Sequence, residues 1–196
     1  MKIPICRFDL ESGTLCPNCQ ERLDKGKITS FDIEFCKWLM EKEKDYPALE
    51  NLNLQRAIKV ADWLILVVKK RTKASLLSAV DLINDITETF GEVIIIEGSI
   101  KLRKIVRTFI DPAIEVGVNS LHLPGGYRES IVILRADDRE RIRYTNAQLK
   151  SIVSAIMGEQ VLFEYDDERL EKEDDATESE FEEKMRKLSE RRRDMD

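Results

Sequence analysis

Hydrophobic positions divide the chain into short apolar runs and helical stripes. Continuous apolar runs at 63–68 and 93–96 have the length of buried strands, and a shorter strand is expected at 57–60. Residues 73–90 carry apolar side chains at helical spacing, which predicts one helix that ends at Gly91.

The same order then recurs further along the chain. The turn signal Pro124-Gly125-Gly126-Tyr127 predicts a hairpin between two strands, and Gly158 closes a helix before the last strand. We expect a helix at 99–110, strands at 118–123 and 129–135, a helix at 145–157 and a strand at 161–165. The unit strand, helix, glycine, strand therefore occurs twice, at 63–96 and 131–165.

The amino-terminal part has a different pattern. Residues 1–28 are rich in turn signals, and Thr29 with Asp32 predicts the capped start of a helix that runs to about Lys44. These patterns predict an α+β protein in four parts. The parts are a cysteine-bearing segment with its helix at 1–50, a first α/β module at 54–112, a second module at 113–165, and a charged tail at 166–196.

Charge is distributed unevenly between the modules and the tail. Residues 166–196 hold 14 acidic and 8 basic residues, whereas the other 165 residues hold 24 of each sign. The tail has too few apolar residues to fold alone, so we expect a disordered stretch or a solvated helix. Phe181, Met185 and Leu188 leave open a weak amphipathic face for a partner. The acidic pI of 5.1 is compatible with modules that bind nucleic acid.

No apolar run reaches the about 18 residues that a membrane helix needs. The start of the chain also lacks the apolar region of a signal peptide. We therefore expect a cytoplasmic protein without membrane contact, in which cysteine thiols stay reduced and favour metal over disulfides.

The cysteines have a spacing that predicts a metal site. Cys6, Cys16, Cys19 and Cys36 follow the pattern C-x9-C-x2-C-x16-C. Four thiolates would form a closed, structural Zn²⁺ site that holds residues 1–28 in place. Cys36 lies within a predicted helix, and Asp9 or Asp24 could replace it as a ligand. The alternative is a C-x2-C turn with unrelated buried cysteines.

The two recurring units resemble the tandem KH domains of NusA-type transcription factors, particularly short archaeal NusA-like proteins. The resemblance covers about residues 57–165, and Cys6, Cys16-Pro17-Asn18-Cys19 and Gly26 resemble the cysteine-bearing leader of some archaeal members. It implies two KH-like modules and an RNA-binding accessory factor of transcription or translation. The alternative is a protein-interaction scaffold that docks on RNA polymerase or the ribosome after its RNA-binding loops were lost.

KH domains bind RNA through a GxxG loop between two helices. The corresponding positions are Leu77-Ser78-Ala79-Val80 and Tyr144-Thr145-Asn146-Ala147, and neither contains a glycine. We expect the first to be part of a continuous helix. The second keeps small polar residues, and its tyrosine could stack on a base.

Basic residues near these loops are candidates for contact with single-stranded RNA. Their alternative interpretation is a solvated surface of mixed charge. The candidate nucleic-acid-binding residues are Lys69, Lys70, Arg71, Lys73, Arg139, Arg141, Arg143, Tyr144, Thr145 and Asn146.

Sequence motifs for catalysis are absent. The single histidine, His122, alternates with leucines in a predicted strand and is expected to face the surface. No nucleophile elbow, Walker loop or zinc-protease motif occurs. The sequence therefore predicts a binding protein that is not an enzyme and has no small-molecule substrate.

Overall fold

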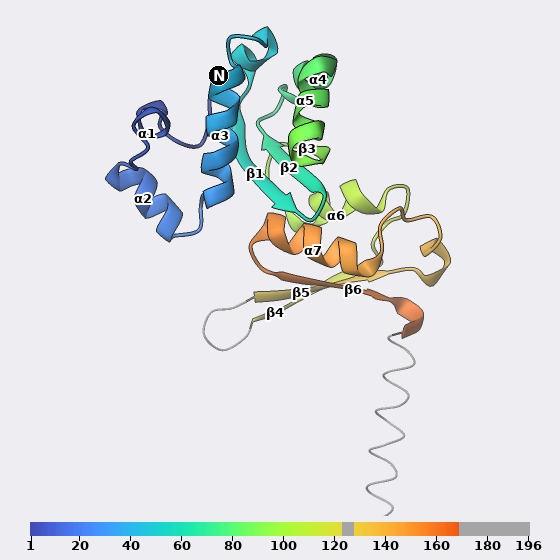
Figure 1. The fold of residues 1–196 in the computed structure, drawn as a ribbon. Coiled ribbons are helices and arrows are strands. Elements are labelled where there is room, and N and C mark those ends of the chain that lie inside the picture. The colour runs from blue at the N-terminus through green and yellow to red at the C-terminus, as the bar shows by residue number, and fades with distance from the viewer. Residues whose placement is uncertain (123–127, 169–196) are drawn as a thin grey trace, which may run out of the picture. The chain divides into compact units, whose positions relative to one another are not determined.

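The structure is a computed structural model that describes residues 1–122 and 128–168. The chain divides into two compact units, Met1–Lys101 and Leu102–Asp196 (Figure 1). Each unit combines helices with one three-stranded sheet, so the predicted α+β class is confirmed. The predicted hairpin turn at 124–127 and most of the predicted tail lie outside the described residues. Within the described part of the chain, no helix has the length and apolar character to cross a membrane.

The first unit is built around a buried central strand. Its elements are α1 (Arg7–Ser12), α2 (Pro17–Asp24), α3 (Ser30–Lys42), the 3-10 helix η1 (Pro47–Asn51), β1 (Leu54–Val60), β2 (Trp63–Val68), α4 (Lys73–Ser78), α5 (Val80–Phe90) and β3 (Glu92–Glu97). Strand β2 pairs antiparallel with β1 and parallel with β3. Every residue from Leu64 to Val68 is buried, as the continuous apolar run predicts.

Helix α3 begins with the predicted cap. The Thr29 hydroxyl accepts a hydrogen bond from the Asp32 backbone N–H, and the Asp32 carboxylate accepts one from the Thr29 N–H. The second Asp32 oxygen accepts the Ala57 N–H at 2.6 Å, and Asp32 is fully buried. One carboxylate thus caps α3 and ties it to β1, which lies alongside it (Figure 1).

The predicted helix at 73–90 is wrong in one respect, because it is two helices. Helix α4 ends at Ser78, and α5 begins at Val80, with Ala79 at φ −90° and ψ 72° between them. Leu76 remains in the core, whereas Leu77 and Val80 on either side of the break are 53% and 60% exposed. Apolar spacing alone did not reveal the break, because Leu76 and Ile83 keep their helical period across it.

Gly91 ends α5 for a steric reason. Its φ is 93°, and a Cβ atom there would lie 2.2 Å from the backbone oxygen of Asp62 in the β1–β2 turn. Only glycine can both adopt this backbone conformation and allow the close approach.

The second unit repeats this arrangement. Its elements are α6 (Leu102–Ile110), β4 (Gly117–His122), β5 (Arg128–Leu134), the 3-10 helix η2 (Ala136–Asp138), α7 (Asn146–Met157) and β6 (Gln160–Tyr165). Strand β5 pairs antiparallel with β4 and parallel with β6, the same order as in the first unit. Helix α6 lies in this unit, whereas the sequence predicts the helix at 99–110 as part of the first module, 54–112.

Helix α7 packs on this second sheet, along β6 (Figure 1). Its N-terminus is held by a capping box between Thr145 and Gln148, and Gly158 ends it at φ 71°. Its buried side is Leu149, Ile152, Val153 and Ile156. These are the apolar positions that the sequence predicts for the inner face of this helix.

Candidate metal centre

Two short helices near the amino terminus bring three cysteines and one aspartate together. Cys6 is the N-cap of α1 and Asp9 lies in its first turn, while Cys16 is the N-cap of α2 and Cys19 lies in its first turn. Neither N-cap thiol makes a capping hydrogen bond, and the Cys6 sulfur instead accepts one from the Cys19 thiol. The same two helix positions therefore supply a pair of ligands twice.

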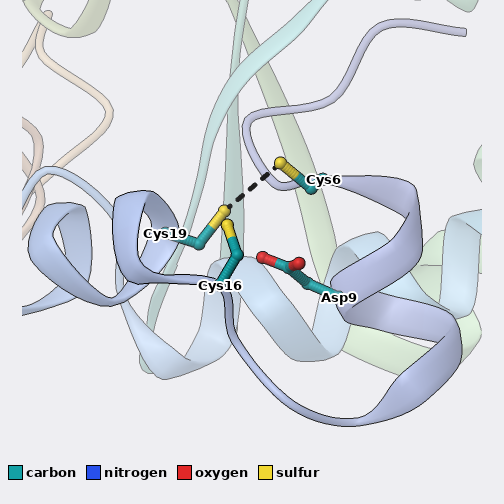
Figure 2. Close-up of side chains that lie close together, drawn as sticks. All are labelled: Cys6, Asp9, Cys16 and Cys19. Carbon is teal, nitrogen blue, oxygen red and sulfur yellow. Dashed lines mark hydrogen bonds between the residues drawn. The ribbon is translucent and has the colours of Figure 1, made fainter.

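The ligand atoms of Cys6, Asp9, Cys16 and Cys19 all lie within 4.8 Å of one another (Figure 2). The Sγ atoms of Cys6 and Cys19 are 3.7 Å apart, and neither cysteine forms a disulfide. Two thiolates bound at about 2.3 Å to one tetrahedral ion lie about 3.8 Å apart, so this separation suits a shared ion. The four residues are close enough to hold a metal ion.

Asp9 provides an independent test of that fit. Its side chain is 3% exposed, and its Oδ2 atom is buried without a hydrogen-bond partner in the structure. A buried carboxylate oxygen without a partner is costly unless a cation is close. A metal ion held with the three sulfurs would satisfy this oxygen.

The electrostatics of the group depend on the same contacts. The hydrogen bond from the Cys19 thiol, opposed by burial, holds the pKa of Asp9 below its usual range. Burial, assisted by the hydrogen bond to Asp9, raises the pKa of Cys19 to about 12. Without a cation the pair is thus a carboxylate and a neutral thiol, and a divalent ion would favour loss of the thiol proton.

Cys36 lies elsewhere, which changes the predicted ligand set at one position. It is fully buried on α3 within the hydrophobic core and is not part of the group around Cys6. Burial, with the charge of Asp32, raises the pKa of its thiol to about 12. Asp9 is the fourth member of the group around Cys6. Asp24, the other carboxylate that the sequence offers, is exposed and accepts a hydrogen bond from Gln20.

The first predicted basic cluster lies in the loop between β2 and α4. Lys69, Lys70 and Arg71 are exposed, and within the described residues their side chains make no ion pair. The Glu97 carboxylate accepts the N–H groups of Thr72, at 3.0 Å, and Lys73, at 3.3 Å. Because this carboxylate already accepts the N–H groups at the start of α4, an anion at this loop would be held by the basic side chains and not by those N–H groups.

The second predicted basic cluster is engaged in contacts within its own unit. Arg139 lies 4.2 Å from the ring centre of Tyr165 and pairs with Asp167 and Glu168 at 3.2 and 2.9 Å. Arg141 pairs with Asp138 at 2.7 Å, and Arg143 lies 5.6 Å from the ring centre of a tyrosine. A phosphate at Arg139 or Arg141 would have to displace a carboxylate.

The polar residues before α7 have structural roles as well. Tyr144 is half-buried and packs edge-on against Phe109, with ring centres 5.6 Å apart. The Thr145 hydroxyl caps α7, and the Asn146 amide donates to the Phe163 carbonyl at 3.5 Å. Base stacking by Tyr144 therefore stays a prediction.

Comparisons with known proteins leave the chain unassigned. No family model matches it, and no curated protein matches it. One similar solved structure, described as "Crystal structure of APE1850", is 16% identical, with 64% of this chain and 96% of that chain covered, at a TM-score of 0.45. A likeness of this degree supports no argument about function.

Proposed function

We propose that the chain is an RNA-binding accessory factor, built from two KH-like units and an amino-terminal segment that a structural Zn²⁺ ion holds in place. It acts by binding, without catalysis, in the manner of the NusA-like proteins that its sequence resembles. The supporting observation is the repeated order of helix, two antiparallel strands, a helical segment and a parallel third strand.

The break at Ala79 adds support from the first unit. A KH module has a loop between two consecutive helices, and α4 and α5 meet within Leu77–Val80. This agreement supports a KH-like order of elements in the first unit, while phosphate contact is proposed for Lys69 and Lys70 and not for the break. In the second unit, the corresponding loop leads into the capped start of α7 at Thr145.

Lys69 and Lys70 are the best candidates for phosphate contact. Both are exposed without an ion pair in the described residues, whereas Arg139 and Arg141 are paired with carboxylates. Lysines of this kind bind phosphates with little dependence on base sequence. We therefore expect RNA affinity that falls steeply with salt.

Zinc is the proposed ion because three thiolates dominate the donor set. Soft sulfur ligands favour zinc over calcium or magnesium, which prefer oxygen. With Asp9 as the fourth ligand the site would be closed, so the ion would fix α1 and α2 and would have no place for a substrate.

Titration of a fluorescent single-stranded RNA 12-mer with the full zinc-loaded chain, from 50 to 300 mM salt, tests the proposal. Loss of two phosphate contacts in Lys69→Ala/Lys70→Ala should lower the slope of log affinity against log salt by about 1.4, at about 0.7 per contact. The matched control is Lys37→Ala/Lys44→Ala, which removes two exposed lysines of α3 and the turn after it and should leave the slope unchanged. Absence of binding at 50 mM salt would refute RNA binding, and equal slopes for both variants would refute the assignment of Lys69 and Lys70.

A further inference from the structure

A pocket of about 340 Å³ lies in the first unit, where the α4–α5 break meets the residues that follow α3. Tyr46 and Asp45 line it from one side, and Ala79, Val80 and Asp81 from the other. The pocket lies at the end of α4 opposite to Lys69 and Lys70, since those lysines precede the helix and the break follows it. It is separate from the metal centre and from the Lys69–Lys70 loop, but it includes Ala79 and Val80 of the segment that corresponds to the KH loop without its glycines.

Apolar side chains are exposed at this pocket because of the helix break. Val80 is 60% exposed and lines the pocket, and Leu77 is 53% exposed two residues before Ala79. Ala48 and Pro47 add further apolar surface to the lining. Val80, Pro47 and Ala48 thus give the pocket a small apolar lining on which an apolar side chain can pack.

The charge around this apolar surface is negative. Asp45 and Asp81 are exposed lining residues, and none of the described residues that line the pocket is basic. Lys42, the last residue of α3, pairs with Asp85 at 3.0 Å, and Lys44, which directly precedes Asp45, is not a lining residue. The effect of these acidic residues on Tyr46 agrees with a negative surface. The hydrogen bond to Asp85, burial and the charges of Asp85, Asp81 and Asp45 raise the pKa of its hydroxyl to about 12.

Nucleic acid does not fit such a surface, because a phosphate there would meet Asp45 and Asp81 with no cation among the lining residues. We propose that the pocket at the α4–α5 break binds a basic segment of a protein partner. An apolar side chain of that segment lies against Val80 and Pro47, and its lysine or arginine side chains pair with Asp45 and Asp81. The first unit thereby offers a surface for protein at one end of α4. This proposal does not depend on RNA binding.

Amide NMR spectra of the ¹⁵N-labelled, zinc-loaded full chain test the proposal. The probe is a capped decapeptide of equal numbers of leucine and lysine, and the control peptide has glutamate in place of lysine. The readout is the amide signals of Tyr46, Ala79, Val80 and Leu82, which we expect to shift and saturate with the lysine peptide alone. Equal shifts with both peptides, or no shift at these four amides, would overturn the proposal.

Two charge reversals on α5 provide a matched pair of variants. Asp81→Lys should weaken binding of the lysine peptide about fivefold, since it removes one surface attraction and adds one repulsion. Glu88→Lys changes an equally exposed acid on the same helix, away from the pocket, and should leave the affinity unchanged. Circular dichroism spectra show whether both variants are folded, and Val80→Ser, which keeps every charge, should also weaken binding. Equal weakening by Asp81→Lys and Glu88→Lys would contradict the assignment.

Two further measurements distinguish other possible occupants of the pocket. If the RNA 12-mer shifts the same four amides, the pocket is a nucleic-acid site and the proposal fails. If sedimentation shows a dimer that Val80→Ser dissociates, the occupant is a second copy of this chain, and the proposal fails as well.

Discussion

The identity of the fourth metal ligand can be decided by comparing substitutions at Asp9 and Cys36. The sequence predicts a site with four sulfurs, whereas the structure groups Asp9 with Cys6, Cys16 and Cys19 and places Cys36 in the core. Asp9→Ala removes the buried carboxylate from the group. Cys36→Ala leaves all four grouped residues unchanged.

The expected effect follows from the number of ligands. Structural zinc binding contributes about 10–16 kcal/mol in small domains, so an equal share for each of four ligands is roughly 2.5–4 kcal/mol. Loss of Asp9 should therefore raise the Kd for Zn²⁺ by about 10²- to 10³-fold. Cys36→Ala should leave this Kd unchanged and lower the free energy of unfolding by about 1 kcal/mol, because a small fully buried group is removed.

Competition with a chromophoric chelator measures the Kd, and elemental analysis gives the metal content of each purified variant. Asp24→Asn is the matched control, because it changes an exposed carboxylate of α2 outside the group and should bind Zn²⁺ as the parent chain does. Loss of the ion from Cys36→Ala, together with full affinity in Asp9→Ala, would refute the ligand set that the structure indicates.

Three further predictions concern stability. The hydrogen bond from Tyr46 and the Lys42 ion pair lower the pKa of Asp85, so their stabilisation exists above the ordinary carboxyl pKa and is lost as pH falls through the lower folded value. Asp85→Asn should therefore reduce the fall in urea midpoint that occurs below about pH 4. An equal fall in the variant and the parent chain would contradict this. The pKa of Tyr46 is raised to about 12, so the stabilisation from its protonated hydroxyl is complete below about pH 10 and is lost as the pH rises to 12. Tyr46→Phe should therefore reduce the fall in urea midpoint between about pH 10 and pH 12. Gly91→Ala should lower the free energy of unfolding by about 2 kcal/mol or more, because a Cβ atom would clash with the Asp62 carbonyl oxygen at a positive φ. Thermal unfolding checks it against Gly26→Ala, which has a positive φ but open space around it; equal losses in both variants would rule out the clash.

Strong local signals made much of the fold predictable. The Thr29–Asp32 cap and the buried run at Leu64–Val68 each have a local cause, and both occur as predicted. The break at Ala79 was missed because Leu76 and Ile83 keep the apolar period of one continuous helix. Helices α1 and α2 were missed because they have only 6 and 8 residues. Segments this short do not show an apolar period that distinguishes a helix from turns.

Three of the four clustered ligands were recognisable from cysteine alone. Asp9 was named only as an alternative, because thiolate is the better zinc ligand and Cys36 was still available in the sequence. One signal for Asp9 was present, since Cys6-x2-Asp9 has the same spacing as Cys16-x2-Cys19. Spacing places Cys36 on the apolar side of its predicted helix, but it does not show whether that side faces the core or the other three cysteines.

The two ligand pairs have a consequence for how this leader can change in length. Each pair belongs to a single helical turn. An insertion between Cys6 and Asp9, or between Cys16 and Cys19, would therefore rotate one ligand atom of the pair away from the other. Residues 13–15, which join the two turns, carry no donor and tolerate added residues at small entropic expense. Insertions and deletions in related sequences should accordingly occur at Gly13–Leu15 and not within either four-residue turn.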